Sequence, residues 1–127
     1  MIVGLTGGIG SGKTTVLKMF EALGAEIFIA DVEAKKIMNT NVELKQQIIN
    51  LLGKEAYKKN TLNNSYIASQ VFENKDKLYA LNQLVHPKVK NALITKAKKN
   101  QEQIIIYEAA ILFESGSYKL CDYVITV

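Results

Sequence analysis

Residues 7–14 read Gly7-Gly8-Ile9-Gly10-Ser11-Gly12-Lys13-Thr14. They match the phosphate-binding loop pattern, in which a glycine and four further residues precede Gly-Lys-Ser or Gly-Lys-Thr. The apolar run Ile2–Thr6 before the loop is typical of a buried strand. Apolar residues at helical spacing after the loop predict a helix over residues 13–23. A strand, a glycine loop and a helix in this order give the pattern its physical meaning.

We expect this loop to hold the phosphates of ATP. Glycines let the backbone curl, so that the amide N–H groups from Gly8 to Thr14 point inward, and the start of the helix adds its positive dipole end. The Lys13 ammonium is expected to reach the β and γ phosphates and to act in catalysis. The Thr14 hydroxyl is expected to bind Mg²⁺.

Outward from the loop, three further apolar runs predict strands: Ile27–Ala30, Ile104–Tyr107 and Tyr123–Val127. The latter two are continuous apolar runs, which fit central strands of a parallel sheet. Between residues 32 and 100 there is almost no strand signal, and the apolar spacing predicts helices over residues 32–38, 42–52, 65–72 and 76–99. We therefore predict an α/β, three-layer P-loop NTPase fold with a central parallel sheet. Its nucleotide-binding core comprises residues 1–31 and 101–127, and residues 32–100 form an all-helical insertion.

The composition indicates one globular domain and excludes several classes of protein. With 127 residues, 48% of them hydrophobic and 22% charged, the chain can bury a core. All sixteen basic residues are lysines, and they are scattered, which favours solvated helix faces over a nucleic-acid surface. The longest nearly apolar stretch, Ile104–Phe113, is about half of a membrane span. We expect a cytoplasmic protein that does not contact a membrane, and the oligomeric state stays open.

Two carboxylates stand at the ends of predicted strands, Asp31 and Glu108. Because the carboxyl ends of parallel strands meet at one edge of a sheet, both acids are expected near the loop. Asp31 either orients and deprotonates an acceptor hydroxyl or caps the helix that follows it. Glu108 either contacts Mg²⁺ through water or caps the end of its strand. The residues alone leave these alternatives open.

Several separated segments together resemble the dephospho-CoA kinase family. They are Leu5–Thr15, Ala30-Asp31, Val71-Phe72, Val85-His86-Pro87, Ile111-Leu112-Phe113-Glu114 and Tyr123–Val127. The resemblance implies transfer of the ATP γ-phosphoryl group to the ribose 3′-hydroxyl of dephospho-CoA, the last step of coenzyme A synthesis. It also implies a fold like that of the nucleoside monophosphate kinases.

The resemblance assigns roles to individual residues. Asp31 matches the acid that faces the acceptor hydroxyl, and residues 32–100 match the domain that binds the acceptor. His86 and Glu114 match family signatures without an assigned role. The family's ATP-binding segment matches Gly10–Thr15, and with the loop pattern this gives the expected ATP-binding residues Gly8, Ile9, Gly10, Ser11, Gly12, Lys13, Thr14 and Thr15.

The chain also departs from the family pattern. An aspartate-valine-proline-leucine segment of many relatives is here Glu108-Ala109-Ala110-Ile111, and a common arginine is here Asn64. The family continues past the position of Val127 through a lid with arginines, a final strand and a final helix. We therefore expect a truncated chain with weak or no kinase activity.

Two other functions fit the same loop. One is a kinase for a different small hydroxyl acceptor, such as shikimate, gluconate or a nucleoside monophosphate. The other is a non-catalytic nucleotide-binding module. The long helical segment favours a bulky acceptor such as dephospho-CoA over a small polyol.

Overall fold

The structure, a computed structural model, describes residues 1–8, 10–110, 112 and 116–127. The chain forms two compact units, Met1–Asp31 with Ala92–Val127, and Val32–Asn91. Their first border lies after Asp31, where the predicted core and insertion meet. Their second border lies inside helix α5 (Lys75–Lys99) and not after residue 100, because this helix continues as one element past Asn91.

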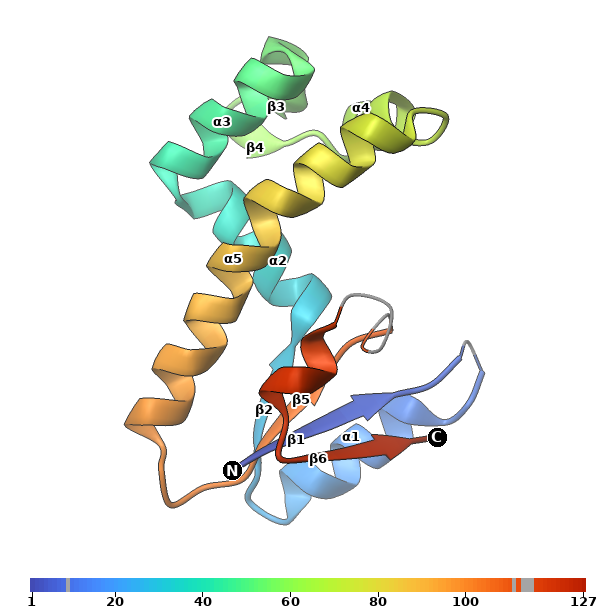
Figure 1. Cartoon of the computed structure of the whole chain (residues 1–127), viewed down its shortest axis with the longest axis vertical. Coiled ribbons are helices and arrows are strands. Elements are labelled where there is room, and N and C mark those ends of the chain that lie inside the picture. Colours follow the sequence, from blue (N-terminus) through green and yellow to red (C-terminus); the bar gives the residue numbers. More distant parts are fainter. Residues whose placement is uncertain (9, 111, 113–115) are drawn as a thin grey trace. The chain divides into compact units, whose positions relative to one another are not determined.

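A four-stranded parallel sheet forms the centre of the first unit (Figure 1). The predicted α/β fold with a central parallel sheet is therefore confirmed. One expectation was wrong: the strand at residues 123–126 lies at the edge of the sheet, since among the described residues it pairs with one neighbour alone. In order across the sheet, the strands are β2 (Glu26–Ile29), β5 (Ile105–Glu108), β1 (Ile2–Thr6) and β6 (Tyr123–Thr126).

One face of this sheet packs against helix α1 (Lys13–Ala22). Val3 and Leu5 of β1 share this face, because alternate residues of a strand point the same way. They form a buried cluster with Leu17 of α1 and Ile106 of β5. The apolar stripe in the sequence of α1 thus fixes the helix to the strand that precedes the loop.

The opposite face carries Gly4, Tyr107 and Phe28 in register across three strands. A Cβ atom added at Gly4 would lie 2.8 Å from the Cys121 Sγ, so the segment that contains Cys121 packs directly on β1. At the other edge, the Lys96 ammonium of α5 donates a hydrogen bond of 3.0 Å to the Ile27 carbonyl oxygen. Phe28 and Tyr107 are buried on this face, so both faces of the sheet are covered, as the three-layer prediction requires.

Helices dominate the second unit, but the prediction that it is all-helical was wrong. A small antiparallel hairpin is present, formed by β3 (Tyr57–Lys58) and β4 (Thr61–Leu62). Its turn residues, Lys59 and Asn60, have φ values of 52° and 65°, and asparagine tolerates this left-handed region. Strands of two residues are too short to show an alternating pattern, which is why the sequence did not indicate them.

The helices of the second unit follow the predicted segments closely. Asn41 and Asn63 cap two of them, since their side-chain oxygens accept hydrogen bonds from the backbone N–H groups of Leu44 and Tyr66. The elements are α2 (Ala30–Thr40), which begins in the first unit, α3 (Val42–Leu52), the 3₁₀ helix η1 (Lys54–Ala56), α4 (Asn64–Val71) and α5.

Candidate functional site

The glycine-rich loop connects the end of β1 at Thr6 to the start of α1 at Lys13. Gly10 and Gly12 have φ values of 78° and 88°, a region that side chains disfavour. The Ser11 backbone N–H donates a hydrogen bond of 3.1 Å to the Gly8 carbonyl oxygen, which closes a turn within the loop. The loop therefore has the curled backbone that its sequence predicts.

At Gly7 the loop packs closely against the residue that follows β6. A Cβ atom added there would lie 2.7 Å from the Ser11 Oγ and 2.8 Å from the Val127 carbonyl oxygen. Real side chains do not come this close to a backbone oxygen. The absence of a side chain at position 7 thus lets the loop fold against the end of β6.

The loop surrounds a cavity of about 450 Å³. Most of the expected ATP-binding residues line it, whereas the exposed Thr15 does not. Ile9 lies outside the described residues. Among the residues that the structure describes, the lining consists of Gly7, Gly8, Gly10, Ser11, Gly12, Lys13, Thr14 and Ala110.

The N-terminus of α1 borders this cavity. Among the described residues, it lacks two features that stabilise the N-terminus of α3, a capping side chain and an acidic residue in the first turn. Within the described residues, no side chain caps α1, and its first turn contains no acid. In contrast, α3 has the Asn41 cap and Glu43 in its first turn. The Ser11 hydroxyl is buried without a hydrogen-bond partner among the described residues. Free N–H groups and the positive end of a helix dipole suit an anion at this place.

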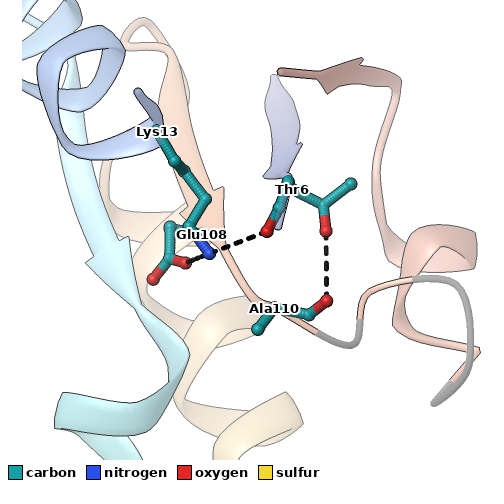
Figure 2. A network of polar contacts seen from close by, with 5 residues as sticks. Thr6, Lys13, Glu108 and Ala110 are labelled. Atoms are coloured by element: carbon teal, nitrogen blue, oxygen red, sulfur yellow. Dashed lines mark hydrogen bonds and ion pairs between the residues drawn. The ribbon is translucent and has the colours of Figure 1, made fainter. Parts of the chain in front are cut away.

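Lys13 and Glu108 form an ion pair (Figure 2). The Lys13 Nζ lies 2.7 Å from the Glu108 Oε1, and the exposed fractions of the two side chains are 19% and 12%. The Lys13 Nζ also donates a hydrogen bond of 3.4 Å to the Gly7 carbonyl oxygen. This contact exists because β5 is the direct neighbour of β1, with Leu5 paired to Glu108.

The sequence indicated both members of this pair but not their contact. Lys13 was expected to bind phosphate, and Glu108 was expected to contact Mg²⁺ through water or to cap a strand. Neither hypothesis required the two side chains to touch, since the contact depends on the order of the strands. That order is a property of the whole sheet and leaves no local sequence signal.

A second contact at the site was also missed. The Thr6 hydroxyl donates a hydrogen bond of 3.3 Å to the Ala110 carbonyl oxygen (Figure 2), and the Ala109 N–H donates one of 3.1 Å to the Leu5 carbonyl oxygen. These bonds hold the segment after β5 against the end of β1. As a result Ala110 forms part of the cavity wall.

Asp31 lies apart from the cavity lining. It is the exposed second residue of α2, and the strand before it, β2, is separated from β1 by β5. The structure therefore brings Glu108 to Lys13 but places Asp31 two strands away from β1. Because α2 begins at Ala30, Asp31 is inside the helix and not the cap that precedes it.

Of the two family-signature residues, His86 is among the described residues and Glu114 is not. His86 is exposed in the interior of α5, directly before Pro87. The helix is continuous at this proline, and its start is at Lys75. Glu114 lies outside the described residues.

In the described ranges, no group of three or more histidine, cysteine, aspartate or glutamate side chains is placed to hold a metal ion. Mg²⁺ commonly binds through one or two protein oxygens together with substrate phosphates. Thr14 is an exposed residue of the cavity wall, and its hydroxyl fits that arrangement. In the same described ranges, no helix is long and apolar enough to cross a membrane.

The parallel sheet, the glycine loop between β1 and α1, and the lysine at the start of α1 define a P-loop NTPase fold. The model of the dephospho-CoA kinase family matches residues 1–127, and the chain belongs to this family.

Individual relatives agree with the family match. Dephospho-CoA kinase of Chlorobium chlorochromatii is 41% identical over 135 residues, covering 100% of this chain and 64% of that protein. The enzyme of the same name from Salinibacter ruber is 40% identical, covering 94% of this chain and 62% of that protein. The chain thus spans less than two thirds of the length of these relatives.

Solved structures show the same fold. TT1252 from Thermus thermophilus superposes with a TM-score of 0.85 at 28% identity, covering 100% of this chain and 64% of that one. Dephospho-CoA kinase from Campylobacter jejuni gives a TM-score of 0.78 at 25% identity, covering 98% of this chain and 64% of that one.

Proposed function

We propose that this chain binds ATP in the glycine-loop cavity, as part of a kinase that phosphorylates the 3′-hydroxyl of dephospho-CoA. The observation that carries the proposal is a cavity walled by glycine backbone, Lys13 and the uncapped N-terminus of α1. Membership of the dephospho-CoA kinase family supports the choice of acceptor.

The residues of the cavity suit a chain of phosphates. Backbone amides around a curled loop act as fixed donors that need no reorganisation when an anion arrives. The buried Ser11 hydroxyl, which has no partner in the described structure, is a further donor beside them. Lys13 is the single charged residue in the described lining, and it would neutralise charge on the terminal phosphates.

Two further roles are part of the proposal. Thr14 would hold Mg²⁺, which when bound neutralises charge on the phosphates and helps to orient them. Asp31 would accept a hydrogen bond from the acceptor hydroxyl, which orients that oxygen and prepares the loss of its proton. The insertion at residues 32–100 is proposed to bind the rest of the acceptor.

Calorimetric titration of the 127-residue chain with ATP and Mg²⁺ tests nucleotide binding. Removal of the Lys13 ammonium by Lys13→Ala should weaken binding roughly ten- to hundredfold, because a hydrogen bond to a charged group is worth about 1.5–3 kcal/mol. The matched control is Lys18→Ala, which removes an exposed lysine of the same helix that does not line the cavity.

The control variant should bind ATP like the unaltered chain. Absence of any heat with the unaltered chain, or equal loss of affinity in the two variants, would refute the proposed role of the loop. The acceptor is tested separately by comparing dephospho-CoA with shikimate, gluconate and nucleoside monophosphates in an ADP-release assay.

A further inference from the structure

The Lys13–Glu108 ion pair has a consequence for what the cavity can bind. Lys13 belongs to the cavity lining, whereas Glu108 does not. Both side chains are mostly buried, and only 2.7 Å separates the charged atoms. The ammonium of a cavity-lining residue is therefore in direct contact with a carboxylate that does not line the cavity.

This carboxylate offsets the charge of the one charged residue in the described lining. A polyphosphate that enters the cavity must share Lys13 with Glu108. Sharing brings phosphate oxygens near a carboxylate of the same sign, in a place that solvent screens poorly. The repulsion falls when the phosphates carry a divalent cation, since the cation neutralises part of their negative charge.

We propose that Glu108 is a positioning residue that holds Lys13 and makes the site select cation-complexed polyphosphate over free polyphosphate. This inference rests on the proposed nucleotide binding. It differs from a water-mediated contact between Glu108 and Mg²⁺, because it acts on the free anion: Glu108 weakens the binding of metal-free nucleotide.

The test measures the dissociation constant of ATP twice for each protein, with Mg²⁺ and with EDTA in its place. The unaltered chain should bind at least tenfold more weakly in EDTA. The variant Glu108→Gln keeps the size of the side chain and removes its charge. It should bind ATP in EDTA about tenfold more tightly than the unaltered chain, with a smaller change in Mg²⁺.

The matched control is Glu102→Gln, which makes the same change of net charge at an exposed residue outside the cavity. It should keep the affinity ratio of the unaltered chain. Glu108→Asp, which retains the charge, should keep the preference for Mg²⁺, so the effect can be assigned to charge.

Several results would overturn the inference. A ratio near one for the unaltered chain would do so without any variant, even if Glu108→Gln failed to fold. A ratio that falls in Glu108→Gln only because binding in Mg²⁺ weakens would show a metal contact instead. Failure of the unaltered chain to bind ATP under both conditions would refute the proposed function as well, whereas an unchanged ratio in Glu108→Gln refutes this inference alone.

Discussion

Gly7 shows how one residue without a side chain holds the site together. It lies where the loop, the buried Ser11 hydroxyl and the end of β6 meet, and a Cβ atom has no room there. The neighbouring Gly8 is different, because a Cβ atom added to it would meet no atom within 4 Å. Substitution by alanine is therefore expected to have different effects at these two glycines, although they are adjacent in sequence.

Gly7→Ala should lower the free energy of unfolding by about 1–3 kcal/mol, since the backbone must shift to relieve the contact with the Val127 oxygen. It should also weaken ATP binding, because the shift displaces the loop. Chemical denaturation gives the stability, and Gly8→Ala is the control. If both variants unfolded at the same denaturant concentration as the unaltered chain, the close approach at Gly7 would be wrong.

At the residue scale, the sequence indicated which residues form the site but not which of them touch. The pattern of glycines, Lys13 and Thr14 was enough to indicate the cavity wall. The ion pair between Lys13 and Glu108 could not be predicted, because the two residues are neighbours only through the order of β1 and β5. The hydrogen bond from Thr6 to Ala110 depends on the same order.

Among the elements, α1 combines two functions that compete. Its buried face stabilises the sheet through Leu17, while its bare N-terminus is available to an anion. An acid in the first turn would stabilise such a helix, and α3 has one in Glu43. We infer that the absence of an acid from the first turn of α1 favours binding over stability.

Thr15→Glu tests this trade-off, because it adds a carboxylate to the first turn of α1 at an exposed position. The stability of the free chain should stay the same or rise by a few tenths of a kcal/mol, up to about 1 kcal/mol. ATP affinity should fall about tenfold, since the new charge repels phosphate. Thr15→Gln is the neutral control and should bind ATP at least tenfold more tightly than Thr15→Glu; equal affinities would contradict the argument.

Long elements were predictable and short ones were not. Helices with a sustained apolar stripe, such as α3 at Val42–Leu52, have the predicted limits. The hairpin of β3 and β4 was missed, because two residues per strand give no periodicity and because hydrogen bonds from outside help to hold it. The Tyr57 hydroxyl donates one of these bonds to the Met38 carbonyl oxygen. Burial raises the pKa of the same hydroxyl to about 12.

At the scale of the whole molecule, the parallel sheet was predictable from continuous apolar runs, whereas the exposed position of β6 at its edge was not.

The chain contains no arginine. An arginine that contacts the transferred phosphoryl group contributes on the order of 10³ to 10⁵ in rate to enzymes that use one. We therefore expect this chain to bind ATP but to release ADP slowly when dephospho-CoA is added. Dephospho-CoA kinase of Chlorobium chlorochromatii, assayed alongside, provides the reference rate; an equal rate for the arginine-free chain would contradict this expectation.

Backbone amides of the glycine loop are proposed to bind the phosphates of ATP. The most direct measurement is a titration of the isotope-labelled 14.1 kDa chain with ATP and Mg²⁺, followed by backbone amide NMR. We expect the largest shifts on the loop and the first turn of α1, from Gly8 to Thr15, and we expect Lys13→Ala to reduce them. Saturating nucleotide that moved amides elsewhere and left this segment unchanged would contradict it.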